Sequence, residues 1–265
     1  MSQSYIKAEK ILCSAGKGEI TKPECLACAL AGNNTCGYDY TLMKYMHEEP
    51  NREGIHVTDL CSCLRKAWYT RKVPVSWYPH DRLVVKLGTA VHEKLEGYED
   101  ENFTPELSLN AFGIEGKCDV WFQKIGRIVD YKTTRWITPS KMPYGSHAEQ
   151  VNIYAAMLRA MGMEVRSAAI QYIDMSGPTK CRRCNAAYVP SDFGVPVCPK
   201  CGSTGKEAHL GALLVEIPLE DTETVVSRIH ERKDILEASL SSGEPPEREQ
   251  GYLCDYCPHA PICLV

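Results

Sequence analysis

Three side chains in the stretch 116–132, GKCDVWFQKIGRIVDYK, have the types and spacing needed for chemistry on a phosphate ester. Asp119 and Asp130 offer carboxylate oxygens, which suit hard cations such as Mg²⁺ and Mn²⁺. Lys132 offers an amine that can orient or deprotonate a water molecule, or hold charge in a transition state. A bound metal would acidify its water and neutralise charge on the phosphate. The set therefore favours phosphodiester hydrolysis, and the alternative is a salt bridge on the solvated face of a hairpin.

The same stretch predicts the hairpin that must position these groups. Val, Phe, Trp, Ile and Tyr favour strands, and Ile125-Gly126 predicts a two-residue turn. In that register Asp119 faces Lys132 and Trp121 faces Asp130. Because side chains alternate along a strand, Asp119, Asp130 and Lys132 share one face. The other face carries an apolar set expected in the core, which comprises Val120, Phe122, Val129 and Tyr131.

Composition predicts a globular chain with one domain of ordinary core size plus attachments. The sequence has 265 residues, of which 24% are charged and 44% apolar. No run of about 18 apolar residues is present, and the first residues lack the apolar core of a signal peptide, so we expect no membrane span and a cytoplasmic location. The net charge of −4 means that a nucleic-acid partner would have to meet a local basic patch.

Fourteen cysteines stand out in this composition. Without an export signal they predict metal sites more than disulfides. The pairs CRRC at 181–184 and CPKC at 198–201 predict a zinc ribbon inserted at 179–209, with rubredoxin-like iron as the alternative. Its expected ligands are Cys181, Cys184, Cys198 and Cys201.

A second group of cysteines lies in a predicted N-terminal metal-binding element, residues 1–50, ahead of a core expected at 51–265. Its members are Cys13, Cys25, Cys28 and Cys36. Four thiolates can bind Zn²⁺ or another metal tetrahedrally and hold together a region too small to fold by burial. Reduced, unpaired thiols are the alternative.

Two helices and a loop carry further candidate residues. The apolar period predicts a helix over 81–98 with His92 at the edge of its stripe, where a structural histidine is the usual role. A helix over 147–161 places Gln150 and Tyr154 one turn apart on one face. The loop 133–145 combines cations with aromatic rings, a pattern that suits single-stranded nucleic acid as well as a plain surface loop.

The cysteine-containing segment 254–263 predicts an incomplete metal site. The segment CDYCPHAPIC supplies Cys254, Cys257 and Cys263, which are one thiolate short of a closed tetrahedral set. The fourth ligand must come from elsewhere. A helix predicted over 56–72 carries Cys61 and Cys63 in its first turn, where buried small residues are the alternative role.

Taken in order, these motifs resemble those of the PD-(D/E)XK nuclease superfamily. The segment Gly88 to His92 looks like its G-x-x-x-H helix, and Gly116 to Asp119 looks like the strand that bears the first metal-binding aspartate. Asp130-Tyr131-Lys132 resembles the (D/E)-x-K element, and Gln150 to Tyr154 resembles the Q-x-x-x-Y helix. The resemblance is strongest to RecB-like nucleases with an iron–sulfur cluster, above all the CRISPR-associated exonucleases of the fourth Cas family.

The resemblance implies a fold and a site. The fold would be α/β, a restriction-endonuclease-like core with a mixed central sheet flanked by helices, carrying the inserted ribbon and a tethered tail. His92, Asp119 and Asp130 would bind Mg²⁺ or Mn²⁺, with the Tyr131 carbonyl as a further ligand. Lys132 would assist the attacking water, while Gln150 and Tyr154 would support the site and the substrate.

The resemblance also implies a [4Fe–4S] cluster that fastens the tail to the first helix. The family carries one cysteine before the core and a C-x2-C-x5-C set after it, which Cys254, Cys257 and Cys263 match. Cys63, followed by Leu64-Arg65, fits the early position better than Cys61 does. Cysteine ligation of such clusters is well precedented.

The implied function is a metal-dependent deoxyribonuclease, an exonuclease on single strands or DNA ends, in CRISPR spacer acquisition with integrase proteins as partners. A recombination or repair nuclease is the nearest alternative. A non-catalytic DNA-binding adaptor or redox sensor is an alternative of another class. The ribbon and the N-terminal cysteines depart from the usual family plan.

Overall fold

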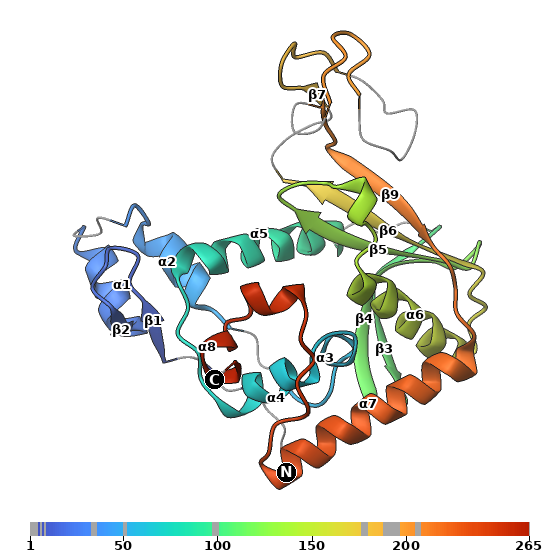
Figure 1. Ribbon diagram of the computed structural model, residues 1–265, viewed down its shortest axis with the longest axis horizontal. Coiled ribbons are helices and arrows are strands. Elements are labelled where there is room, and N and C mark those ends of the chain that lie inside the picture. The colour runs from blue at the N-terminus through green and yellow to red at the C-terminus, as the bar shows by residue number, and fades with distance from the viewer. Residues whose placement is uncertain are drawn as a thin grey trace. The chain divides into compact units, whose positions relative to one another are not determined.

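The computed structural model describes residues 5, 7, 9–32, 36–49, 52–96, 101–175, 180–187, 197–204 and 208–264 (Figure 1). Parts of two predicted elements therefore lie outside the described residues, namely positions within 1–8, 33–35 and 50 of the N-terminal element and 179, 188–196 and 205–207 of the ribbon insert. The chain divides into two compact units. Residues 92–229 form one unit, and residues 1–91 together with 230–265 form the other.

The 92–229 unit is built on a five-stranded sheet in the order β3-β4-β5-β6-β9. Its strands are β3 (Thr104–Ala111), β4 (Ile114–Phe122), β5 (Arg127–Thr134), β6 (Ser167–Asp174) and β9 (Ala212–Ile217). Only the β5–β6 pair among these is parallel. A parallel pair needs a crossover, which α6 (Gly145–Ala160) supplies after the short η1 turn (Pro139–Lys141). This α/β unit with a mixed sheet confirms the predicted fold class and fits a restriction-endonuclease-like core.

The core of this unit lies where α6 packs on the sheet. Every residue of α6 from Gln150 to Leu158 is buried, so the helix is covered on nearly all sides. Facing it, Ile128 and Ile170 are fully buried on neighbouring strands. Burying one such aliphatic side chain stabilises the fold by about 1.5–3 kcal/mol. The first two turns of α7 (Thr222–Ser242) add buried Val225 and Ile229.

The central hairpin has a longer turn than predicted. Its ladder pairs Val120 with Val129 and Phe122 with Arg127, so the turn comprises residues 123–126 and the two-residue turn at Ile125-Gly126 is wrong. The register therefore differs by two residues, an even number, and the predicted division of side chains between the faces survives. Both faces are buried, since Trp121 and Ile128 are only 6% and 0% exposed. The apolar core is thus not confined to one face.

The predicted ribbon insert joins β6 to β9. Its described residues include the strand pair β7 (Lys180–Cys181) and β8 (Ala208–His209). In Figure 1 the insert extends past the ends of β6 and β9.

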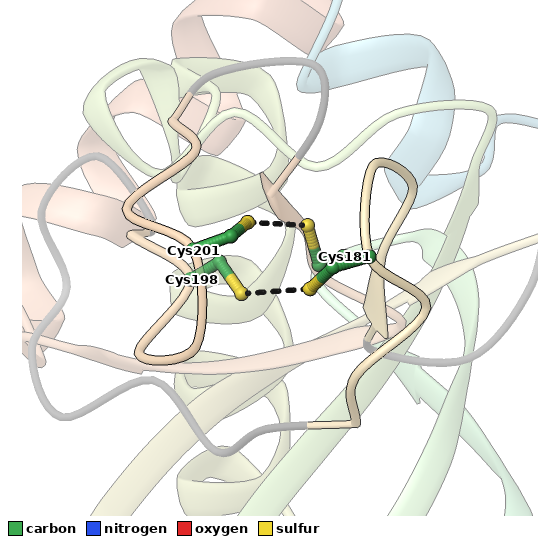
Figure 2. Close-up of side chains that lie close together, drawn as sticks. Cys181, Cys198 and Cys201 are labelled. Carbon is green, nitrogen blue, oxygen red and sulfur yellow. Dashed lines mark hydrogen bonds between the residues drawn. The ribbon is translucent and has the colours of Figure 1, made fainter.

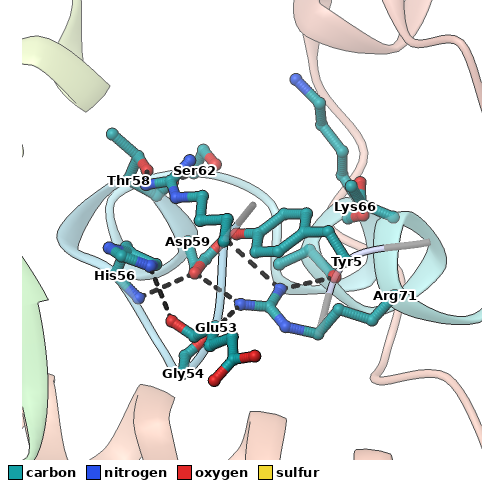
Figure 3. Close-up of polar contacts among 12 residues, drawn as sticks. Tyr5, Glu53, Gly54, His56, Thr58, Asp59, Ser62, Lys66 and Arg71 are labelled. Atoms are coloured by element: carbon teal, nitrogen blue, oxygen red, sulfur yellow. Dashed lines mark hydrogen bonds and ion pairs between the residues drawn. The ribbon is translucent and has the colours of Figure 1, made fainter. Parts of the chain in front are cut away.

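In the other unit, the segment predicted as one helix over 56–72 is two. They are α3 (Val57–Leu60) and α4 (Leu64–Lys72), and Cys63 is the residue that caps α4. A buried ion pair joins them, with Arg71 Nη2 lying 2.7 Å from Asp59 Oδ2 (Figure 3). Tyr5 donates to the same carboxylate at 2.6 Å, and the backbone amide of His56 donates at 2.8 Å. Because both charges are buried and multiply bonded, this network fixes the loop that carries Cys61 and Cys63.

The tail of the chain packs on α4 within this unit. It contains η3 (Tyr252–Tyr256) and α8 (Ala260–Cys263), which lie beside α4 in Figure 1. Tyr69 stacks on His259 with ring centroids 5.4 Å apart, and its hydroxyl donates to the Ile262 carbonyl at 3.5 Å. Arg65 donates to the Pro246 carbonyl at 3.0 Å. The tail is therefore attached along the length of α4.

The N-terminal part of this unit is small. It consists of a hairpin, β1 (Lys10–Leu12) and β2 (Glu19–Thr21), followed by α1 (Lys22–Leu30) and α2 (Tyr40–His47). The boundary between the units falls within α5 (Pro79–Glu96). Among the described residues, no helix combines the length and the apolar character that crossing a bilayer requires.

Gly126 is the turn residue that the sheet depends on, and its replacement tests the revised turn. Its φ is +63°, and an added Cβ would lie 2.5 Å from the carbonyl oxygen of Glu164. We expect Gly126→Ala to lower the free energy of unfolding by about 2 kcal/mol or more, measured by urea denaturation. Gly145→Ala is the control, because nothing lies within 4 Å of a Cβ there. Equal stability of the two variants would contradict this account.

Candidate active site and metal centres

Three carboxylates occupy facing positions on three neighbouring strands. The two-residue turn Phe112-Gly113, with φ of 56° and 69°, sets the β3–β4 register. Pro105 then pairs with Val120 and Leu107 with Cys118, which leaves Glu106 opposite Asp119. The β4–β5 pairing, continued by one position, leaves Asp119 opposite Asp130. Facing residues point to the same side of a sheet, so the row gathers three acids on one face.

The backbone ladder is interrupted at this row. Neither Glu106 and Asp119 nor Asp119 and Asp130 form a ladder pair. Glu106 has φ of 48°, which is uncommon outside glycine and marks local strain. The amide of Tyr131 donates to Asp119 Oδ2 at 2.6 Å, a role that a backbone carbonyl plays in an unbroken ladder. Between β4 and β5, the Asp119 carboxylate thus accepts a hydrogen bond where a backbone carbonyl of the neighbouring strand would otherwise accept one.

His92 on α5 meets two of these acids. Its Nδ1 lies 3.3 Å from Asp119 Oδ1 and 3.5 Å from Glu106 Oε1. Lys117 Nζ is 2.8 Å from the other oxygen of Glu106. The ligand atoms of His92, Glu106 and Asp119 all lie within 4.8 Å of one another. An imidazole with two carboxylates is a donor set for a divalent cation of the Mg²⁺ or Mn²⁺ type.

The charges of this group are strongly coupled. The hydrogen bond to Asp119, followed by that to Glu106, raises the pKa of His92 to about 10. Burial alone would raise the pKa of Glu106, but His92 and Lys117 outweigh it and lower that pKa. At neutral pH His92 therefore carries a proton that a metal ion would have to replace.

Asp130 is the most buried acid of the row. Its side chain is 0% exposed, and Lys132 Nζ lies 2.7 Å from Oδ2. Among the described residues, neither oxygen of Asp130 accepts a hydrogen bond of good geometry. Burial raises its pKa despite the opposing charge of Lys132. A buried carboxylate so poorly bonded is costly, and a nearby divalent cation would lower that cost, so the residues fit a bound metal. Its oxygens nevertheless lie outside the 4.8 Å group.

Gln150 and Tyr154 lie on α6 as predicted for one helical face. Gln150 Nε2 donates to Tyr154 Oη at 2.7 Å, and both side chains are buried. Burial, followed by the charge of Asp130, raises the pKa of Tyr154 well above its usual range. The helix therefore brings a neutral phenol near the acidic row.

Glu106 is the site residue that the sequence analysis missed. None of the motifs described in the sequence analysis includes it. Counting back from the Phe112-Gly113 turn would have placed it opposite Asp119, but Phe at a position with positive φ is a weak turn signal.

The ribbon cysteines form a second compact donor set (Figure 2). Cys181 Sγ lies 3.5 Å from Cys201 Sγ, and Cys184 Sγ lies 3.6 Å from Cys198 Sγ. The two knuckles have the same geometry: the fifth residue of each, Asn185 or Gly202, has positive φ and donates its amide to the first cysteine's carbonyl at 2.8 Å. Four thiolates so close together are compatible with Zn²⁺ or with an iron centre.

The ribbon also contacts the loop 133–145, whose pattern suits single-stranded nucleic acid as well as a plain surface loop. The Arg182 guanidinium lies 4.8 Å from the ring centroid of Trp136. A cation stacked on an aromatic ring beside the sheet is the type of surface that takes bases and phosphates.

The cysteines of the tail and of the N-terminal element are more widely spaced. Among the described residues, only the ribbon set and the His92 set place three or more ligand atoms within 4.8 Å of one another. Cys63 stands at the start of α4, where Glu249 of the tail accepts from the Leu64 amide at 3.4 Å. Arg232 donates to the Leu60 carbonyl at the end of α3 at 2.6 Å and to the Ser62 carbonyl in the following loop at 2.5 Å. The loop that carries Cys61 and Cys63 is thus bonded to the segment that leads to Cys254, Cys257 and Cys263.

Comparison with known proteins gives one family. No curated protein sequence matches the chain. The structure of SSO0001 is similar at 18% identity with a TM-score of 0.43, over 84% of this chain and 91% of that one. A phage-related exonuclease from Haemophilus somnus 129PT is similar at 13% identity with a TM-score of 0.32, over 60% of this chain and 68% of that one.

The family itself is identified by a sequence match, not by these structural likenesses. Residues 41–264 match the sequence model of one superfamily. The matched range contains the acidic row, the (D/E)-x-K element at 130–132 and the buried helix α6. The chain belongs to the PD-(D/E)XK nuclease superfamily.

Proposed function

We propose that the chain is a Mg²⁺- or Mn²⁺-dependent deoxyribonuclease that acts as an exonuclease on DNA ends or single strands. Membership of the superfamily implies hydrolytic nuclease activity on phosphodiester bonds. The observation that carries the proposal is the donor set of His92, Glu106 and Asp119 beside the buried, poorly bonded carboxylate of Asp130. Glu106 joins the three ligands expected from the sequence, and the Tyr131 carbonyl remains a proposed ligand.

The chain's own groups divide the chemistry between them. A divalent cation held by His92, Glu106, Asp119 and Asp130 would acidify water and neutralise phosphate charge. Lys132 Nζ, fixed 2.7 Å from Asp130, is placed to orient the attacking water and to stabilise negative charge as it develops. The hydrogen bond from Gln150 orients the phenol of Tyr154, whose raised pKa keeps it a hydrogen-bond donor.

The wider arrangement suits a DNA strand. Trp136 and Arg182 offer a ring and a cation for an unpaired strand. We assign Zn²⁺ to the ribbon, since sulfurs on a tetrahedral zinc lie about 3.8 Å apart for Zn–S bonds of about 2.3 Å. The biological setting we propose is cytoplasmic, the trimming of DNA for CRISPR spacer acquisition beside integrase proteins, on the strength of the motif order described above.

We also propose that Cys63, Cys254, Cys257 and Cys263 hold a [4Fe–4S] cluster. Four cysteines are the usual ligands of such clusters. The bonds from Arg232 and Glu249 support this assignment, because they hold the Cys63 loop against the tail independently of any metal. The cluster would add covalent links between the start of α4 and the tail.

Removal of site residues tests the nuclease. Asp119→Ala and Lys132→Ala should each lower the rate of cleavage of end-labelled single-stranded DNA in Mn²⁺ on the order of 100-fold or more. Lys124→Ala and Glu164→Gln are matched controls, because both residues lie on the surface away from the row. Iron and zinc contents should stay unchanged in all four variants. Full activity of both site variants would refute the assignment.

The pKa of His92 predicts how metal binding responds to pH. Because the folded pKa is raised to about 10, His92 is protonated through neutral pH, and a metal ligand must lose that proton. Mn²⁺ affinity without DNA should therefore rise with pH between about 6 and 8, by up to about tenfold per pH unit. Calorimetry in buffers of different ionisation enthalpy should show proton release. His92→Gln should bind more weakly with a flatter slope, and an unchanged slope would count against His92 as a ligand.

Separate substitution of Cys63 and Cys61 tests the proposed tail cluster. Cys63→Ala should lower absorbance near roughly 400 nm and remove about four iron atoms per chain. Cys61→Ala, two residues away in the same loop, should keep them. If Cys61→Ala loses the iron instead, Cys61 is the fourth ligand and Cys63 is not. If neither variant loses iron, the cluster is bound elsewhere.

A further inference from the structure

The four cysteines of the N-terminal element line a single cavity of about 240 Å³. Cys13 follows β1, Cys25 and Cys28 lie on α1, and Cys36 precedes α2, so three separate segments deliver the sulfurs to one place. These cysteines lie outside the nuclease site, and the proposed nuclease chemistry makes no use of them.

We propose that Cys13, Cys25, Cys28 and Cys36 hold a second iron–sulfur cluster in this cavity. Cys25 and Cys28 are three residues apart on α1 and therefore project from the same side of the helix. The helix start is fixed by a capping box, in which Thr21 Oγ1 accepts from the Glu24 amide at 3.3 Å and Glu24 accepts from the Thr21 amide at 2.8 Å. The two sulfurs are thus presented by a helix with a fixed beginning.

The shared cavity brings all four groups to one part of the molecule, and two local features agree with this. The amide of Cys13 donates to the Gly18 carbonyl at 2.8 Å, which closes the β1–β2 hairpin at the cavity. Burial, and then the charges of Cys36, Cys13 and Cys28, raise the pKa of the Cys25 thiol to about 11. Each of the other three cysteines is therefore an electrostatic neighbour of Cys25.

The spacing favours a cluster over a single zinc ion. Four sulfurs on one tetrahedral zinc lie about 3.8 Å apart. The ribbon meets this condition with contacts of 3.5 and 3.6 Å. In the N-terminal set, by contrast, no three sulfurs fall within 4.8 Å of one another, although all four face the same cavity. A cluster places a separate iron atom at each thiolate, so it spreads its ligands farther apart and fills a larger space.

The walls of the cavity suit such a group. They are largely apolar and include Ile11, Ile20, Ala29 and Met43. Lys17 Nζ lies 3.9 Å from Cys28 Sγ, where its charge would offset that of a thiolate-bound cluster. The carboxylate of Glu24 also lines the cavity, but the Thr21 amide and hydroxyl both donate to it at 2.8 Å. An apolar shell with one nearby cation limits water access to the metal.

The small size of the apolar core in the N-terminal element indicates a structural role for the cluster. The buried cluster here contains six residues, Ile11, Cys25, Ala29, Met43, Met46 and Trp77. So few apolar side chains rarely stabilise a separate element, and bound metal commonly supplies the missing free energy of folding. We therefore expect the second cluster to be structural and to hold the hairpin, α1 and α2 together.

Metal analysis of the full chain, purified without oxygen, tests this proposal apart from nuclease activity. Cys28→Ser and Cys36→Ser should each lose about four iron and four sulfide per chain while keeping the wild-type zinc content. Cys184→Ser is the matched control, which should lose zinc and keep the iron. Limited proteolysis should also cut the two N-terminal variants sooner within residues 9–49 than the control.

Two results would overturn the proposal. If Cys28→Ser and Cys36→Ser lose zinc and keep all their iron, the centre is zinc; if neither metal changes, there is no centre. Where these variants fail to accumulate, Cys257→Ser decides, since it removes a ligand of the tail cluster only. About four iron and four sulfide remaining in Cys257→Ser would support the second cluster, and an iron-free protein would exclude it.

Discussion

The candidate site depends on the interruption of the β ladder at the row of three acids. Facing carboxylates repel each other, so a row of Glu106, Asp119 and Asp130 across three strands costs stability. The structure offsets this cost with cations placed at each end, His92 and Lys117 at Glu106 and Lys132 at Asp130. The Tyr131 amide replaces a lost backbone bond by binding Asp119. Strain and charge are therefore concentrated where a divalent ion would relieve both, as expected of a site selected for function and not for stability.

The two units are stabilised by different kinds of interaction. The 92–229 unit buries a whole helix against its sheet. The other unit lacks a helix buried to that extent among its described residues, and relies more on polar links. The Asp59–Arg71 pair holds α3 to α4, and Arg232 and Glu249 hold the tail to the loop between these helices. Cys61 and Cys63 lie in the loop that these polar links hold in place.

The faces of the central strands could be predicted from the sequence, whereas the turn length, the break between α3 and α4 and the role of Glu106 could not. Alternation along β4 and β5 was enough to place Asp119, Asp130 and Lys132 on one face, because an even error in register preserves faces. It did not give the turn length, since Gly126 bonds to residues 166 and 167, which are remote in sequence. The break between α3 and α4 escaped notice because the apolar period continues across it. Glu106 escaped because its position is set by Phe112, a residue without turn propensity.

The division of the chain has a consequence for its synthesis. The 92–229 unit is continuous in sequence, so all of its residues have been made before translation reaches position 230. The other unit must wait for residues 230–265 to join the first 91. During that interval α4 has no tail to cover it. A ribosome that pauses late in the message would thus leave the residues of the sheet complete while those of the other unit are still incomplete, a state that exposes apolar surface for longer.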